Sequence, residues 1–453
     1  MSKIFKNENF YLVPILILAI LIRYLYYIHA PGVIVSEDTY SYYLTGQEIL
    51  KTKIPVGDYR TPVYPLFLHL VTFLSGSPNA PILSQPFFNA MFYTIIIQSV
   101  LGLCSLIILY KSLRLLKLNI KLAYAFTLFT GVNIILFSWE RLLLTESMAI
   151  FILISVFFVI LKILENPKFT YFLILFCLLL TQVMLRPIYV AFPIIPLFII
   201  PFLLGKKRVL TYSLLVVVVY FITLSIYAKI NYRLYGVHSI TRASDITMLG
   251  KILDFKLPIE NAKDERFYYE AVTKYRQEGR ELNPFRFLEY NDLIRKDRLL
   301  LLLKLKDFDA KVLAAVYPEY IGKSLLQIPG SLLDTSEKII VTAGSNNFLD
   351  FLFKILFQFY KYLQFSFLII FPCAPIAFFN FLKKPSYESA IVSILGGISL
   401  YQIIFAVFFG YSEFGRLICI AQPMMYLFSF YCWWKILRVL HYSSRSKWRD
   451  LLI

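Results

Sequence analysis

The stretch FYLVPILILAILIRYLYYI, residues 10–28, decides the fold class of this protein. Arg23 is its one charged residue. A helix of this length and polarity matches the hydrocarbon thickness of a bilayer. The run is longer than a usual signal-peptide core, and no small-x-small cleavage site follows it. We therefore expect a retained membrane span.

Comparable apolar runs recur along the whole chain. Its 453 residues are 58% hydrophobic and 16% charged, with a mean hydropathy of +0.67, whereas a soluble domain carries about 25% charged residues. The sequence predicts an all-α polytopic membrane protein with about ten spans. They are expected near residues 10–28, 86–110, 122–138, 147–161, 170–186, 188–204, 210–228, 362–381, 389–409 and 417–437.

The formal net charge of +18 indicates membrane topology rather than a nucleic-acid partner. Lysine and arginine gather in short connections that alternate with base-poor ones, which is the positive-inside pattern. No nucleic-acid-binding motif accompanies them. The clusters predicted to lie in the cytoplasm, together with both termini, are Lys3/Lys6, Lys111 to Lys121, Lys162/Lys168, Lys206 to Arg208, Lys383/Lys384 and Lys435 to Arg449.

This topology divides the chain into three parts. Residues 1–230 are expected to form a membrane module of about seven spans with a first external loop over 30–85. Residues 362–453 form a second module of about three spans. Between them, residues 231–361 form an external cap of amphipathic helices, because most of this segment is dense in charge and has helical periodicity.

The acidic residues outside the cap gather on the predicted outer face. Eleven acids lie outside residues 231–350, and seven of them fall in external connections: Glu37, Asp38, Glu48, Asp58, Glu140, Glu146 and Glu413. Charges at membrane depth are costly and usually functional. Their distribution predicts an active site that opens to the outer side.

Glu37 and Asp38 are neighbours in the first external loop. Adjacent carboxylates repel each other, so one of them is expected to have a raised pKa and to accept a proton near neutral pH. Helix capping or ordinary solvation in a loop is the alternative.

Arg60 opens the sequence RTPVYP, which leads into the short apolar stretch Tyr64 to Leu74. This stretch is too short to span, and we expect an interfacial helix. A guanidinium at its start suits a phosphate, and a helix N-terminus adds to anion affinity. An arginine bound to lipid headgroups is the alternative.

Arg141 and Glu146 lie in WERLLLTES, residues 139–147, at the mouth of the fourth span. In one continuous helix they would be about 140° apart. At least one is therefore expected to meet a partner from elsewhere in the chain, unless they form a polar plug between helices.

Two more arginines are predicted at the outer face. Arg186 ends the fifth span, where Pro187 breaks the helix. Arg416 follows Glu413 at a spacing of three, for which a local salt bridge is the default. The four histidines are scattered, His238 among them, and show no metal-ligand spacing. We expect no cofactor, although a divalent metal remains an open alternative.

The order of these motifs resembles the GT-C glycosyltransferases, and within them the lipid A aminoarabinose transferases and protein O-mannosyltransferases. The similar elements are D-x-x-x-Y (Asp38, Tyr42), R-x-P-x-Y-P (Arg60, Pro62, Tyr64, Pro65), R-L-L-L-T-E (Arg141 to Glu146), R-P (Arg186, Pro187) and G-R-x-x-x-x-x-x-P (Gly415, Arg416, Pro423). The resemblance covers most of residues 10–200 and 400–425. The cap matches in position and character only.

The resemblance implies a GT-C-like bundle that moves a sugar from a polyprenyl phosphate to a lipid, glycan or protein hydroxyl with inversion. The reaction would take place on the outer face of the cell membrane, or in the endoplasmic reticulum lumen of a eukaryote. Asp38 or Glu37 would be the base. Cations would stabilise the departing phosphate, with candidates Arg60, Arg416, Arg141, Arg186 and Arg242. Further site candidates are Tyr42, Tyr64, Glu146, Glu413 and His238.

Two other functions stay open. An envelope polysaccharide polymerase or ligase would use a lipid-linked oligosaccharide, and the early acidic pair argues mildly against it. A transporter would need charged groups near the middle of the bilayer, whereas here they are expected at the outer mouths of the helices.

Overall fold

The computed structural model describes residues 12–78, 80–293, 303–335, 346–412 and 414–450. These residues form helices, with one isolated bridge between Ile34 and Leu142 and no strand. The first half holds α2 (Leu12–His29), α3 (Glu37–Thr52), α4 (Val63–Leu74), α5 (Gln85–Leu115), α6 (Ile120–Gly131), α7 (Ile134–Phe137), α8 (Glu146–Glu165), α9 (Phe169–Leu185), α10 (Ile194–Leu204) and α11 (Lys207–Tyr235). The second half holds α12 (Ala243–Asp254), α13 (Arg266–Gln277), α14 (Pro284–Tyr290), α16 (Leu305–Ala315), α17 (Tyr317–Leu333), α19 (Asn347–Leu363), α20 (Ile370–Lys383), α21 (Tyr387–Phe409), α22 (Phe414–Ile418) and α23 (Gln422–Asp450).

Eight helical stretches in the described part of the chain are long and apolar enough to cross a membrane. The segments Ile120–Gly131 and Ile134–Arg141, bent by 50° at their junction, add a ninth if they form one span. A helix occupies each of the ten predicted positions, and α9, with 17 residues, is shorter than the eight long stretches. The protein is a multi-pass helical membrane protein with eight or nine such stretches among its described residues, and the shorter helix α9 occupies the remaining predicted position.

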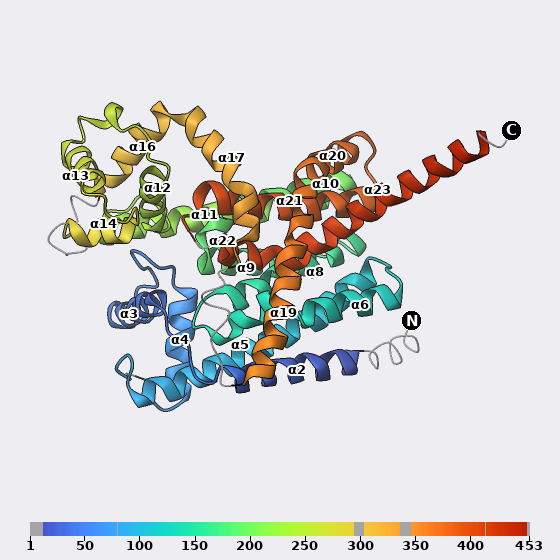
Figure 1. Ribbon diagram of the computed structural model, residues 1–453, viewed down its shortest axis with the longest axis horizontal. Helices are drawn as coiled ribbons and strands as arrows, with labels where there is room; N and C mark the ends of the chain where they lie inside the picture. The colour runs from blue at the N-terminus through green and yellow to red at the C-terminus, as the bar shows by residue number, and fades with distance from the viewer. Residues whose placement is uncertain (1–11, 79, 294–302, 336–345, 413, 451–453) are drawn as a thin grey trace.

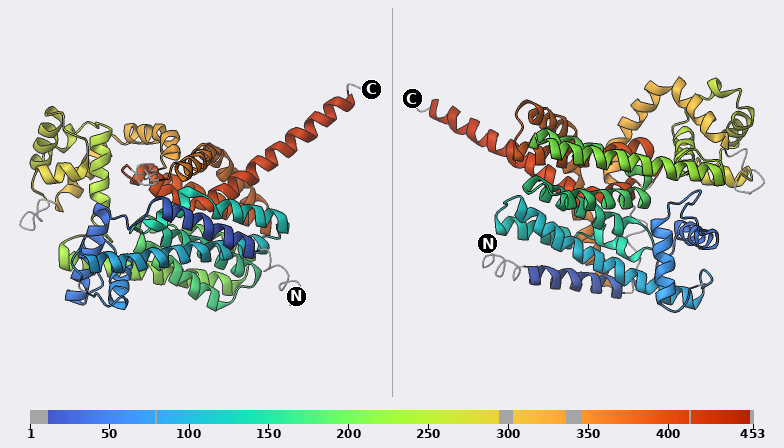
Figure 2. Two further views of the ribbon diagram at one scale, coloured as in Figure 1. Left: turned by 60° about the horizontal axis from the view of Figure 1, so that its bottom comes forward. Right: turned by 180° about the vertical axis from the view of Figure 1, so that it is seen from behind.

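The long helices run side by side along the longest axis of the molecule (Figure 1). α2, α5 and α11 follow this axis, and α23 extends beyond the bundle at one end. The short helices α3 and α4 and the helices from α12 to α16 gather at the opposite end, as the two other views also show (Figure 2). One end of the bundle therefore carries α3, α4 and the cap helices from α12 to α16.

The surface of α11 shows how a span meets its surroundings. Leu214, Val218, Ile222 and Ile226 recur every four residues and are each about half exposed, while Tyr220 on the opposite face is buried. An apolar stripe of this kind would be unfavourable in water and is stable in contact with lipid tails.

The described residues pack into two separate apolar cores. The main core joins the long helices. The second lies within α12 to α17 and extends from Ile246 to Tyr320. Ile328 in α17 and Phe353 in α19 belong to the main core. The part of the predicted cap that has its own core is therefore shorter than residues 231–361.

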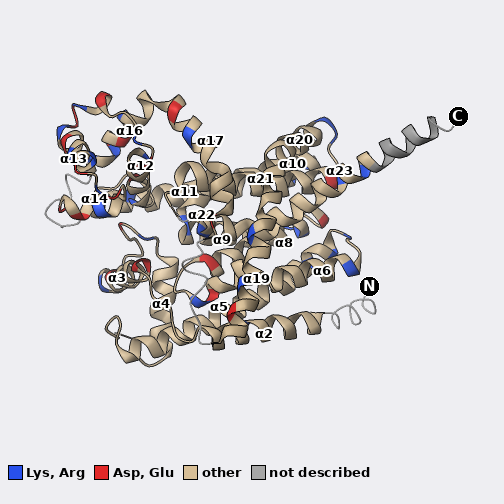
Figure 3. Ribbon diagram, viewed as in Figure 1, with Lys and Arg blue, Asp and Glu red and all other residues tan. Residues whose placement is uncertain are grey.

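Basic and acidic residues are distributed unevenly over the bundle (Figure 3). The turns that follow α5 and α20 carry lysines and lie at the end opposite the short helices. Acidic and basic residues also lie close together along the ribbon near α3, α5 and α22. This second group contains the candidate site.

Candidate active site

The first turn of α3 positions Asp38. Ser36 caps the helix, since its Oγ accepts from the Thr39 backbone N–H at 3.3 Å and Thr39 Oγ1 accepts from the Ser36 N–H at 3.1 Å. Thr39 Oγ1 also donates to the Leu143 carbonyl at 3.2 Å, which ties the start of α3 to the segment before α8. A carboxylate in the first helical turn is favoured by the helix dipole.

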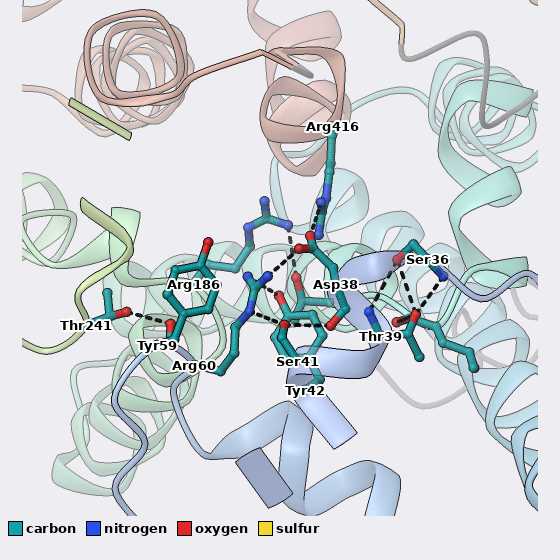
Figure 4. Close-up of polar contacts among 12 residues, drawn as sticks. Ser36, Asp38, Thr39, Ser41, Tyr42, Tyr59, Arg60, Arg186, Thr241 and Arg416 are labelled. Atoms are coloured by element: carbon teal, nitrogen blue, oxygen red, sulfur yellow. Dashed lines mark hydrogen bonds and ion pairs between the residues drawn. The ribbon is translucent and has the colours of Figure 1, made fainter. Parts of the chain in front are cut away.

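Asp38 lies between two arginines that come from opposite ends of the chain (Figure 4). Arg60 Nη2 donates to Asp38 Oδ1, and Arg416 Nη1 donates to Asp38 Oδ2. Both carboxylate oxygens are thus engaged. The side chains of Asp38, Arg60 and Arg416 are 27%, 15% and 11% exposed, so solvent reaches this group mainly at Asp38.

Arg60 is held in a fixed orientation by its neighbours. Its guanidinium lies between the rings of Tyr42 and Tyr59, 4.5 Å from each centroid. Its Nε donates to Ser41 Oγ at 2.7 Å. Tyr42 in turn packs edge-on against Tyr64 at 5.0 Å. The rings of Tyr42 and Tyr59 and the hydroxyl of Ser41 therefore fix the orientation of the guanidinium that contacts Asp38.

Glu146 links Arg416 to a third arginine. Its Oε1 accepts from Arg416 Nε and, at 2.6 Å, from Arg186 Nη1. Arg186 Nη1 also donates to Thr145 Oγ1 at 2.9 Å. The side chain of Glu146 is fully buried. A buried carboxylate without cations would be very unfavourable, so Glu146 and the two arginines require one another.

The result is an alternating row of charges, Arg60–Asp38–Arg416–Glu146–Arg186, which we call the charge row. It contains three guanidinium groups and two carboxylates, so one positive charge is in excess. Each member lies in or beside a helix end. An accessible row with excess positive charge can bind an anion such as a phosphate.

The predicted raised pKa at the acidic pair is wrong for Asp38. Burial alone would raise the pKa of Asp38, but the charges and hydrogen bonds of Arg60 and Arg416 outweigh it and hold the pKa well below its usual range. Glu37 is exposed, so solvent screens its repulsion, whereas the arginines are in direct contact. Asp38 is therefore a carboxylate at neutral pH.

Arg141, predicted as a phosphate ligand, contacts the first loop in the structure. Its Nη2 donates to the carbonyls of Ala30, at 2.6 Å, and Gly32, and its guanidinium lies 4.7 Å from the ring centroid of Tyr27. Arg141 ends a short 3-10 helix, Ser138–Arg141, and α8 begins only at Glu146. The assumed continuous helix between them is absent, and each side chain meets partners from other segments.

Three other predicted residues, Arg242, His238 and Glu37, lie outside the charge row. Arg242 pairs with Asp58, with 3.0 Å between Nε and Oδ1. His238 stacks on Tyr232, with 3.6 Å between the ring centroids. Glu37 is exposed, and its charge interacts with Arg286 of α14. Glu413 lies outside the described residues, so the predicted local pair with Arg416 is not described.

The sequence prediction missed Tyr59, Ser41 and Thr145. Tyr59 directly precedes Arg60, and burial raises its pKa to about 12, so it stays neutral against the guanidinium. Ser41 lies one helical turn after Asp38, which was a usable signal. Thr145 belongs to the R-L-L-L-T-E element, but its contact with Arg186 depends on the packing of α8 against α9.

Among the described residues, no group of three or more histidine, cysteine or acidic side chains is arranged to hold a metal ion. In comparisons with known proteins, no family model matches the chain, and no curated protein matches it significantly.

Proposed function

We propose that the protein is an inverting glycosyltransferase that moves a sugar from a polyprenyl-phosphate donor to a hydroxyl acceptor at the outer face of the membrane. One observation carries the proposal: Asp38 is held between Arg60 and Arg416 at an accessible end of a multi-pass bundle. Such a transfer needs a carboxylate for the acceptor proton and cations for the departing phosphate.

The chemistry assigned to Asp38 is proton acceptance. The acceptor O–H proton passes to the carboxylate as the acceptor oxygen forms a bond to the anomeric carbon. The bond from that carbon to the phosphate oxygen breaks, and its electron pair stays with the phosphate. Attack opposite to the leaving group inverts the anomeric configuration.

Arg60 and Arg416 are assigned to the phosphate. The donor carries one negative charge, and the departing phosphate monoester tends toward two, so fixed cations stabilise the transition state more than the bound donor. A phosphate that engages the arginines also competes with Asp38 for them. Asp38 then becomes more basic, and it does so when the donor is present.

Glu146 and Arg186 are assigned to positioning Arg416. Glu146 is fully buried and contacts Arg416 and Arg186. The contact with Glu146, which is itself paired with Arg186, holds the Arg416 guanidinium in a fixed position. Because Arg186 brings the positive charge into excess, it also favours an anion at the accessible side of the row.

The position of the charge row favours an enzyme over a transporter. Its members lie in or beside helix ends, whereas a transporter would place its substrate-binding charges at the bilayer midplane in broken helices. A polymerase or ligase could use the same row with an oligosaccharide donor. An assay that compares monosaccharide and oligosaccharide donors distinguishes the polymerase or ligase from the proposed transferase.

The test follows release of polyprenyl phosphate by purified protein from a short-chain polyprenyl-phosphate sugar. We expect the wild type to release it, and Arg60→Ala and Arg416→Ala to lose most of this activity. The Arg→Lys variants should recover only part, since lysine keeps the charge and loses the fork. Arg266→Ala is the matched control, because Arg266 is 85% exposed in the cap.

Release at the wild-type rate by both alanine variants would mean that these arginines only anchor lipid. A wild type that acts only on oligosaccharide donors would favour the polymerase or ligase. A wild type inactive with every donor and acceptor would remove the enzyme assignment.

A further inference from the structure

Arg242 holds Asp58 at two points. Its Nε donates to Asp58 Oδ1 at 3.0 Å, and its backbone N–H donates to the Asp58 carbonyl at 3.1 Å. Its Nη2 donates to the carbonyl of Tyr235, the last residue of α11, at 3.2 Å. Arg242 is 3% exposed. The start of the cap is therefore fastened to the loop that precedes α4.

Two neighbours of this pair add bonds to the same loop. Thr241 Oγ1 donates to the Tyr59 carbonyl at 2.7 Å (Figure 4). Tyr227 in α11 accepts at its hydroxyl from the Gly57 backbone N–H at 3.4 Å. Three consecutive residues, 57 to 59, are thus bonded by the segment between Tyr227 and Arg242. We call this set of bonds the loop clamp.

The next residue along the chain is Arg60. Its guanidinium is oriented by α3, through Asp38 and Ser41, while its main chain follows directly from the clamped residues. At Gly57 the loop turns so tightly that an added Cβ would overlap the Arg60 carbonyl. A shift of the clamp would therefore move the origin of the Arg60 side chain.

We propose that Arg242 is a positioning residue for Arg60: through Asp58, it sets where that guanidinium meets the anionic group of a lipid-linked phosphate. This inference rests on the proposed function. Arg242 does not belong to the charge row and binds no substrate in this scheme. It replaces the direct phosphate role that the sequence suggested for it.

Asp58 is the partner of Arg242 in the loop clamp, and its side chain is the more exposed of the two. Its side chain is 31% exposed, against 3% for Arg242. Asp58→Asn keeps an oxygen that can accept from Arg242 Nε but leaves the buried guanidinium without its counter-charge, so it is expected to weaken the clamp. Arg242→Met removes the charge and the donors at once. Because both act on one interaction, the second substitution should add little once the first is present.

The first measurement needs no donor. Backbone hydrogen exchange of the donor-free protein is followed by mass spectrometry in peptides covering residues 54–62 and 37–52. We expect Arg242→Met and Asp58→Asn to speed exchange in 54–62 and to leave α3 unchanged. Lys311→Met is the matched control, since Lys311 forms ion pairs with Asp264 and Glu265 inside the cap.

The second measurement is the affinity for a short-chain polyprenyl phosphate. Because small misplacements of a binding group are costly, we expect each variant to bind about tenfold more weakly, with the double variant no worse than Arg242→Met. Unchanged exchange in 54–62, or faster exchange with unchanged affinity, would overturn the positioning role. A wild type that binds no polyprenyl phosphate would overturn the proposed function, and the exchange comparison alone would then show whether Arg242 holds the loop.

Discussion

At the residue scale, the two arginines control how basic Asp38 is. Burial opposes its ionisation, and Arg60 and Arg416 more than offset this, so its pKa is low in the absence of substrate. A carboxylate with a depressed pKa is always ready to accept a proton but accepts it weakly. It becomes an effective base only if another anion takes its place beside the arginines.

Under the proposed transferase function, this arrangement predicts how kcat/KM depends on pH. Asp38 is deprotonated above its pKa, so kcat/KM should show no loss attributable to it between pH 7 and about pH 5. Removal of one arginine takes away part of the positive charge that lowers the pKa of Asp38, whereas the burial that raises this pKa stays. Arg60→Ala should therefore show an acid limb at higher pH than the wild type.

The profile is measured with a short-chain donor at substrate concentrations below KM. An acid limb near neutral pH in the wild type that Asp38→Asn abolishes would contradict the low pKa. An unshifted limb in Arg60→Ala would contradict the control of Asp38 by that arginine.

Part of this site could be predicted from the sequence. The gathering of acids and arginines at the helix mouths was predictable, because charges are placed there at the least cost. Which arginine meets which carboxylate was not. Arg141 and Arg242 satisfy the same sequence criteria as Arg60 and Arg416, and only packing decides that they bond loop carbonyls and Asp58.

At the element scale, the cap is joined to α22 as well as to the first loop. Lys251 in α12 is buried, and its Nζ donates to Gln327 Oε1 at 2.7 Å and lies 4.7 Å from the ring centroid of Phe414. Phe414 is the first residue of α22, which carries Arg416. The cap thus contacts both of the segments that supply arginines to Asp38.

Lys251 makes a prediction about stability. Burial lowers its pKa to about 8, and Asp254 offsets this in part. The folded protein therefore bears the cost of a buried ammonium below about pH 8, and this cost fades as pH rises toward the ordinary pKa of 10.5. We expect Lys251→Met to be more stable than the wild type at pH 7, by up to about 3 kcal/mol, and the gain to shrink by pH 10.

Apparent melting temperatures in detergent at pH 7 and pH 10 test this expectation. Lys311→Met is the control, because its ammonium is 38% exposed and paired. A Lys251→Met protein that melts below the wild type at pH 7 would show that the contacts of Lys251 with Gln327 and Phe414 outweigh the cost of burying its charge.

Hydrophobicity predicted correctly where helices occur, but it did not predict where one helix bends or ends. A helix occupies each predicted span, and α9 ends at Leu185, directly before the break that Pro187 was expected to cause. Residues 362–381 were predicted as one separate span. They fall in α20 and the end of α19, which are joined by a 3-10 segment, Gln364–Ile369, within one apolar stretch. Apolarity does not reveal where a helix bends.

At the scale of the whole molecule, the two ends of the bundle differ. Lysine-bearing turns lie at one end, and the cap, α3 and α4 at the other (Figure 3). Basic connections stay in the cytoplasm. We therefore predict that the cap end faces outward. This orientation brings the charge row to the outer face.

Labelling of single cysteines in intact cells tests the orientation. In a cysteine-free background, a membrane-impermeant reagent should label Ser244→Cys in the cap and should not label Ser386→Cys in the turn after α20, both of which are exposed positions. The reverse labelling pattern would mean that the topology is inverted and that the charge row lies on the cytoplasmic side.

The role of Asp38 decides between catalysis and simple anion binding. Asp38→Asn keeps the size of the side chain and removes its capacity to take a proton. The measurement is the initial rate of sugar transfer at saturating donor, with the wild type and Asp38→Asn at equal protein abundance and Glu37→Gln as the neighbouring control. We predict that Asp38→Asn lowers the rate by about two orders of magnitude or more, the usual contribution of a general base, and that Glu37→Gln has a smaller effect. Near-normal transfer by Asp38→Asn would contradict the assignment of Asp38 as the catalytic base.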